Sequence, residues 1–177
     1  MYLLIFGDQI SSLNIFNNNF KGNKFGVYCS RNNNFNPSKA TNYLNVRKNI
    51  FTQDTLCIGV SLFNVRNARV AENIINVGVH DYVPFNGHGY FPSGIKADGY
   101  SDKTDINSNK IYYNPEQVNQ VSFFGINFKD TSGIARRIFN NLIVANYNNA
   151  ELENVLFGIY LGVTDSVDVV NNSVFFK

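Results

Sequence analysis

The sequence predicts an all-β fold, a right-handed parallel β-helix (solenoid) of about six coils with three parallel sheets and no substantial helix. Two repeated patterns predict it. The first, [Ile/Val]-x-x-Asn-x-[Phe/Ile/Val], occurs six times, and its asparagines are Asn18, Asn49, Asn73, Asn109, Asn141 and Asn172. The second, Gly-[Ile/Val]-x-x, begins at Gly26, Gly59, Gly94, Gly125 and Gly158. Repeats of this kind are typical of solenoids, in which each coil stacks on the one before.

The distance between successive asparagine motifs sets the length of a coil. The motifs start at Ile15, Val46, Val70, Ile106, Ile138 and Val169, so the intervals are 31, 24, 36, 32 and 31 residues. Such variation is typical of a solenoid whose loops differ in length. A chain of 177 residues with 44% hydrophobic content predicts a single β-helix domain over residues 1–177.

Each period contains three short strands. The last one reads Gly-Ile-Tyr-Leu from Gly158, Val-Asp-Val from Val167 and Ser-Val-Phe from Ser173. Apolar and polar residues alternate in these segments, as in half-buried strands, and each segment is too short for a helix. Stacked periods would place equivalent strands about 4.8 Å apart in three parallel sheets, and six coils would stand roughly 29 Å tall.

The same alternation predicts which residues face the interior. The first sheet should bury Val27, Cys29, Val60, Leu62, Ile95, Ala97, Ile126, Phe128, Ile159 and Leu161. The second sheet should stack Val46, Val70, Ile106, Ile138 and Val169 in one interior column. Arg136 stands where an apolar residue is expected, so its coil is either shifted in register or shields the charge.

The motif asparagines are expected at the turn between the second and third strands. Asparagine tolerates a left-handed backbone there, and its carboxamide can bond to the coils above and below. Such ladders accompany parallel strands that repeat in register. The chain holds 30 asparagines, which favour turns over helix interiors, and we assign the motif asparagines a structural role.

Composition argues against several functions. The net charge of +2 comes from 15 basic and 13 acidic residues without a run of like charge, so nucleic acid is not an expected partner. The apolar segment at residues 1–6 is too short for a signal peptide, and no membrane span is seen. Cys29 and Cys57 match no metal-site spacing and are expected to be buried thiols, so no metal site is predicted.

The repeats resemble those of the pectin-lyase-like parallel β-helix family. The resemblance is carried by Gly-Ile-Tyr-Leu and Val-Asp-Val-Val-Asn-Asn-Ser-Val within residues 158–174, and it extends over nearly the whole chain. The family includes polysaccharide lyases, glycoside hydrolases, epimerases and bacteriophage tailspikes. The resemblance therefore implies the fold and, by analogy, a carbohydrate ligand.

The resemblance also implies a site on the outer face of the first sheet. Two aromatic rings and three polar groups there would suit a sugar-binding groove, because rings cover apolar sugar faces and polar groups meet hydroxyls. Alternation places these residues on that face: Tyr28, Ser61, Lys96, Asn127 and Tyr160. An ordinary solvated sheet face is the alternative.

Two insertions, at about residues 30–42 and 76–93, could border this groove. The second holds both histidines, His80 and His88, and Lys96 and Asp98 follow it. With Asp81 they form the candidate catalytic group, because an acid, a base and a cation could converge beside one coil. The Gly-His-Gly motif around His88 is similar to one of polygalacturonase-type hydrolases, but the paired aspartates of those enzymes are not visible.

Three functions remain open. The first is a polysaccharide-recognising surface β-helix that resembles a bacteriophage tailspike, outside a cell or on a virion. The second is a stand-alone glycoside hydrolase or polysaccharide lyase, without a cofactor or, for a lyase, with Ca²⁺ held beside a Lys or Arg base. The third is a structural spacer without a ligand. Both ends lie within a coil, so a longer β-helix, capping domains or a homotrimer are expected to cover them.

Overall fold

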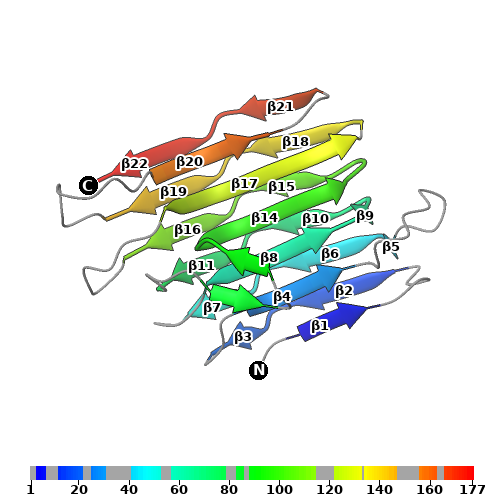
Figure 1. The fold of residues 1–177 in the computed structure, drawn as a ribbon, viewed down its shortest axis with the longest axis horizontal. Coiled ribbons are helices and arrows are strands. Elements are labelled where there is room, and N and C mark those ends of the chain that lie inside the picture. Colours follow the sequence, from blue (N-terminus) through cyan, green and yellow to red (C-terminus); the bar gives the residue numbers. More distant parts are fainter. Residues whose placement is uncertain are drawn as a thin grey trace.

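The chain, seen in a computed structural model, is an all-β parallel solenoid (Figure 1). The structure describes residues 3–6, 12–21, 25–30, 41–52, 57–78, 83–85, 88–114, 122–132, 134–146, 156–162 and 166–177. At 3–6, 41–42, 83–85, 88–90 and 130–132 it describes the backbone alone. These residues contain strands and turns but no helix, which confirms the predicted fold class.

Within the described residues, three sheets of six strands each wind around one core, and we name them A, B and C. Sheet A contains, in spatial order, β1 (Leu3–Phe6), β4 (Phe25–Ser30), β8 (Ile58–Phe63), β14 (Ser93–Tyr100), β17 (Phe123–Ser132) and β20 (Leu156–Leu161). Sheet B contains β2 (Leu13–Phe16), β6 (Leu44–Arg47), β10 (Arg69–Ala71), β15 (Asp105–Asn107), β18 (Arg136–Phe139) and β21 (Val167–Val170). Sheet C contains β3 (Asn19–Phe20), β7 (Ile50–Thr52), β11 (Ile74–Val77), β16 (Lys110–Tyr113), β19 (Leu142–Ala145) and β22 (Ser173–Phe176).

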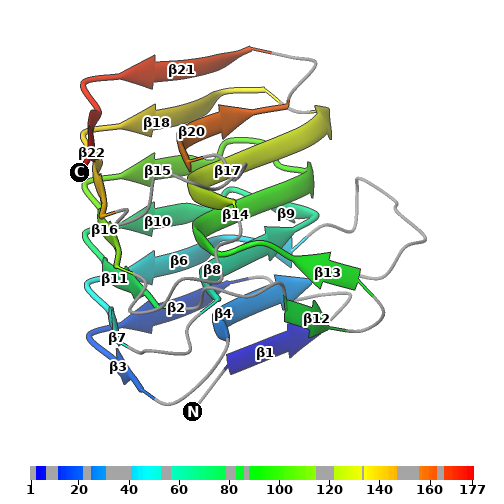
Figure 2. The same ribbon diagram turned by 60° about the vertical axis from the view of Figure 1, so that its left-hand side comes forward.

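Two small sheets lie outside this framework. The strands β5 (Thr41–Asn42) and β9 (Val65–Arg66) pair in parallel between sheets A and B. The strands β12 (Val83–Phe85) and β13 (His88–Tyr90) form an antiparallel hairpin within the insertion that the sequence places at 76–93. Figures 1 and 2 both show this hairpin beside β4 and β8, on the outer side of sheet A.

The register stacks equivalent repeat positions, as predicted. In sheet A the successive partners are Val27, Val60, Ile95, Ile126 and Ile159. In sheet B they are Ile15, Val46, Val70, Ile106, Ile138 and Val169. The prediction of a wholly interior position is wrong for Val169 and Leu161, which are 42% and 41% exposed because β21 and β20 are edge strands.

Arg136 is shielded and its coil is not shifted. It pairs with Val167 while Ile138 pairs with Val169, so the register of β18 is unbroken. The side chain is fully buried, Nη2 donates to the carbonyl oxygen of Ser166 at 3.3 Å, and the guanidinium lies 5.8 Å from the ring centroid of Phe128. Of the two alternatives open from the sequence, shielding is confirmed.

The repeated glycines lie where sheet A meets the side chains of sheet C. A Cβ atom at Gly94 would lie 2.4 Å from Cγ2 of Ile111 and 2.6 Å from the carbonyl oxygen of Gly125. Equivalent sheet C side chains crowd the other four glycines, Gly26, Gly59, Gly125 and Gly158. The glycine pattern is therefore a packing requirement, since no side chain fits at this position.

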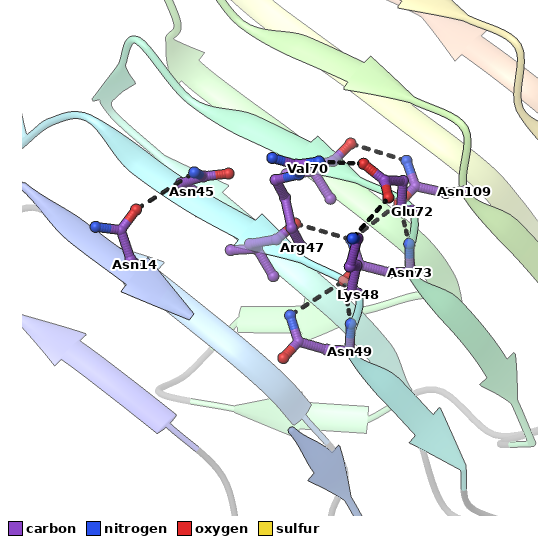
Figure 3. Close-up of polar contacts among 10 residues, drawn as sticks. Asn14, Asn45, Arg47, Lys48, Asn49, Val70, Glu72, Asn73 and Asn109 are labelled. Atoms are coloured by element: carbon purple, nitrogen blue, oxygen red, sulfur yellow. Dashed lines mark hydrogen bonds and ion pairs between the residues drawn. The ribbon is translucent and has the colours of Figure 1, made fainter. Parts of the chain in front are cut away.

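The motif asparagines form a hydrogen-bonded ladder at the corner between sheets B and C (Figure 3). The backbone N–H and Nδ2 of Asn73 donate to Oδ1 of Asn109 at 3.1 and 2.9 Å, and Nδ2 also donates to the carbonyl oxygen of Val46 at 2.9 Å. Bonds between successive carboxamides connect all six: Asn18, Asn49, Asn73, Asn109, Asn141 and Asn172. The predicted ladder is confirmed.

The left-handed residue of this corner is not the ladder asparagine. It is the residue before it, with φ between 54° and 58°, at Asn17, Lys48, Glu72, Ser108, Asn140 and Asn171. The expectation that the motif asparagine itself is left-handed is therefore wrong. The backbone reverses one residue earlier, which leaves the asparagine N–H and carboxamide directed along the ladder.

Candidate functional site

The five residues predicted for the outer face of sheet A occupy one column across adjacent strands. Tyr28 pairs with Ser61, Ser61 with Lys96, Lys96 with Asn127, and Asn127 with Tyr160. Parallel pairing sets these backbones about 4.8 Å apart, so the column runs along the solenoid axis.

One half of this column is covered. Tyr28 and Ser61 are only 8% and 4% exposed, so they do not line an open groove as expected. The Tyr28 ring packs edge-on against Phe25, with centroids 6.0 Å apart. The backbone of the hairpin β12–β13 lies on the outer side of β4 and β8 (Figure 2). Lys96, Asn127 and Tyr160 are partly exposed and form the open half. A ligand on this face would therefore bind toward β17 and β20.

Lys96 and Asp98 are neighbours on the outer face of β14. Their Nζ and Oδ2 atoms lie 3.4 Å apart, with the side chains 20% and 32% exposed. Oδ1 of Asp98 accepts a hydrogen bond from the N–H of Gly99 at 2.9 Å. Asp98 also pairs across strands with Lys129, an exposed residue of β17. The outer face of β14 thus presents an ammonium and a carboxylate side by side, and a second lysine stands on the neighbouring strand.

An aromatic strip borders the open half of the column, and sequence reasoning identified only Tyr160 from it. Phe124 and Phe157 stack with ring centroids 4.9 Å apart and planes 6° apart. The Tyr160 ring stands edge-on to both, with centroids at 5.6 and 5.4 Å. Phe91, which is 44% exposed, lies 6.0 Å from Phe124. The sequence could have revealed this strip, because Phe124 and Phe157 each precede a repeat glycine and therefore occupy equivalent positions in adjacent coils. In the structure they are direct cross-strand partners.

Asn127 has an unusual environment at the centre of the open half. Its Oδ1 atom is shielded from solvent and accepts no hydrogen bond from the residues that the structure describes. The ladder asparagines differ, because each Oδ1 of the buried ones accepts two bonds. The two cross-strand partners of Asn127 are Lys96 on β14 and Tyr160 on β20.

A second polar cluster occupies the corner between sheets A and B. Asp102 accepts hydrogen bonds from the hydroxyl of Tyr100, from Nη2 of Arg66 at 3.1 Å and from the N–H of Ile134 at 2.8 Å. Burial raises the pKa of Asp102, but these donors outweigh it and the net pKa is lowered. The bond to Asp102 and burial raise the pKa of Tyr100. These residues lie in three successive coils, so we interpret the cluster as structural.

The carboxylate of Asp105 faces away from the candidate site. It lies on the outer face of sheet B, where Oδ1 and Oδ2 accept from Nε and Nη2 of Arg137 at 2.8 and 2.7 Å. This two-point pair raises the pKa of Arg137. Its position makes it a matched ion pair on another face, suitable as a control for Lys96 and Asp98.

The remaining candidate catalytic side chains lie outside the described part of the structure. His80 and Asp81 lie outside the described residues, and for His88 the structure describes the backbone of β13 alone. Residues 31–40 of the other insertion also lie outside. Among the side chains that are described, no group of three or more His, Cys, Asp or Glu lies close enough to hold a metal ion. The catalytic role of these residues stays a prediction.

Comparisons with known proteins identify no relative from which a function could be inferred. No protein-family model matches the chain, and no match was found among curated proteins or solved structures. In the described residues, no helix is long and apolar enough to cross a membrane.

Proposed function

We propose that the outer face of sheet A binds a polysaccharide, with Lys96, Asn127 and Tyr160 as its polar contacts. The observation that supports this best is the aromatic strip beside the polar column on one rigid sheet. Glycans present apolar ring faces and hydroxyl edges in close alternation, so they match a surface that offers aromatic carbon and hydrogen-bonding groups side by side.

Charge supports the same class of ligand. Lys96 supplies N–H donors and Asp98 supplies acceptor oxygens within 3.4 Å of each other, so together they can meet neighbouring hydroxyls of one sugar. Their rigid position on β14 lowers the entropy lost on binding. The resemblance of the repeats to the pectin-lyase-like family agrees with a carbohydrate ligand. In this proposal the protein acts at a cell or virion surface, as tailspikes do.

The test is a glycan array probed with the wild-type chain and with the double variant Lys96→Ala, Asp98→Ala. We expect binding of the recognised glycan to weaken at least tenfold, on the order expected for loss of charged hydrogen bonds. The melting temperature should change little, because both side chains are partly exposed. Assays for new reducing ends and for unsaturated products on the same glycan would detect a hydrolase or a lyase.

The matched control is Asp105→Ala, Arg137→Ala, which removes an ion pair from the outer face of sheet B. This variant should bind glycan as the wild type does. Full affinity in the Lys96, Asp98 variant together with loss in the control would move the site to sheet B. If no glycan binds the wild-type chain, the spacer function is favoured instead.

A further inference from the structure

We infer that the recognised glycan carries an acetamido group and that Asn127 reads it, an inference that rests on the proposed polysaccharide site. The juxtaposition behind it is an unpaired, solvent-shielded Oδ1 acceptor beside an aromatic strip on the one side and a lysine on the other. The acceptor, the aromatic strip and the lysine each place a separate requirement on the ligand.

The first requirement is a hydrogen-bond donor. Folding alone gives no reason for a carboxamide at this position, because the equivalent residues of the column are of other types, namely Tyr28, Ser61, Lys96 and Tyr160. A shielded acceptor without a donor destabilises a fold. The Asn127 side chain is partly exposed, so a rotation of its carboxamide would bring Oδ1 within reach of a ligand N–H or O–H, which would satisfy it. A carboxylate would not, since it offers only acceptors.

The second requirement is an apolar group next to that donor. Tyr160 is the cross-strand partner of Asn127, and its ring contacts both Phe124 and Phe157. A bare hydroxyl would satisfy Oδ1 and leave this aromatic surface uncovered. A methyl group bonded close to the donor would cover part of it.

The third requirement is an acceptor on the opposite side. Lys96 is the other cross-strand partner of Asn127, so its ammonium lies on the β14 side while the aromatic rings lie on the β20 side. An acetamido group supplies all three features within four heavy atoms: an N–H for Asn127, a carbonyl oxygen for Lys96 and a methyl for the strip around Phe124. A plain hydroxyl or a uronate carboxylate supplies fewer.

The test compares N-acetylated oligosaccharides with their chemically de-N-acetylated forms, and chitotetraose with cellotetraose, by titration calorimetry. We expect the wild-type chain to bind the N-acetylated member of a recognised pair at least tenfold more tightly. Asn127→Leu should reduce this preference to less than threefold. Its melting temperature should stay level or rise, because an unpaired acceptor is removed. Asn127→Asp keeps an acceptor oxygen and should keep a preference.

Asn45→Leu is the matched control, since Oδ1 of Asn45 is also shielded and unpaired but lies on sheet B between Asn14 and Arg69. It should leave the preference unchanged. A preference that survives Asn127→Leu would overturn the role of Asn127. Glycans that bind through Lys96 and Asp98 without regard to N-acetylation would overturn the acetamido inference and leave the proposed function standing. Absence of any glycan binding would overturn both.

Discussion

The two corners that flank sheet B are built in different ways. The corner between sheets B and C has two residues in every coil, a left-handed residue and a ladder asparagine, as at Lys48 and Asn49. The corner between sheets A and B varies from residues 133–135 in one coil to residues 31–43 in another. Side-chain bonds between identical residues fix the first corner, whereas the side-chain bonds of the second, such as those to Asp102, are made by residues of different types.

The constant corner between sheets B and C maintains the fold, whereas the variable corner between sheets A and B borders the candidate binding face. Repeated bonds tolerate no insertion, because an extra residue would displace the asparagine from its partners above and below. Among the described residues of the corner between sheets A and B there is no such ladder, and the cluster around Asp102 supplies local stability there. Variation between coils is therefore admitted on the side that borders the outer face of sheet A.

The largest effect is expected from breaking the regular corner with Asn109→Leu. The N–H and Nδ2 of Asn73 would lose their acceptor and the carbonyl oxygen of Val70 its donor, all in a fully buried position. We expect a loss of about 3 kcal/mol or more in the free energy of unfolding, measured by denaturant titration. Asn146→Leu, which removes an exposed carboxamide bond, should change it by less than about 0.5 kcal/mol. Equal effects of the two would show that the ladder is not needed for stability.

A smaller effect is expected at the variable corner from Asp102→Asn. The variant loses the charge that Arg66 and Tyr100 contact and should lower the free energy of unfolding by about 1–3 kcal/mol at neutral pH. Because the pKa of Asp102 is lower in the folded state, its stabilisation is complete above the unfolded value of about 4 and disappears as pH falls through the folded pKa.

The gap in stability between wild type and Asp102→Asn should therefore narrow as the pH is lowered from about 5 toward 2. Thermal melts at a series of pH values measure this gap. A gap that stays constant with pH would mean that the charge of Asp102 does not contribute to the corner.

The smallest effect is expected where a left-handed backbone is occupied by alanine. Ala135 is exposed and has φ 53° at the variable corner. Ala135→Gly should raise the free energy of unfolding by about 0.5 kcal/mol, because relief of the left-handed strain exceeds the added flexibility of glycine. Ala145→Gly, in the strand β19, should lower it by about 1 kcal/mol. A lower melting temperature for Ala135→Gly would contradict the prediction that the left-handed backbone at Ala135 destabilises the fold.

Sequence reasoning located the features that depend on one residue type recurring at one position. The asparagine ladder, the glycine column and the register of Val46, Val70 and Ile106 follow from such recurrence. Recurrence did not predict which residue has the left-handed backbone, since Lys48, Glu72 and Ser108 at that position have no side-chain chemistry in common.

The candidate site was predicted in part for the same reason. Alternation found the column of Lys96, Asn127 and Tyr160, because outward positions obey the strand period. The burial of Tyr28 and Ser61 could not be predicted, because the strand period assigns a residue to a face and does not say what covers that face. The unpaired Oδ1 of Asn127 depends on side-chain neighbours across strands, which no periodicity records.

The asparagine ladder treats every coil alike: Asn73 bonds to Asn109 as Asn109 bonds to Asn141. A duplicated coil placed between two of them would meet the same donors and acceptors, so the joint would be indistinguishable from its neighbours. Each duplication would lengthen the solenoid by about 4.8 Å and add one strand to the outer face of sheet A. The ladder therefore allows the solenoid to lengthen by whole coils, and the face available to an extended ligand would grow by one strand spacing with each coil.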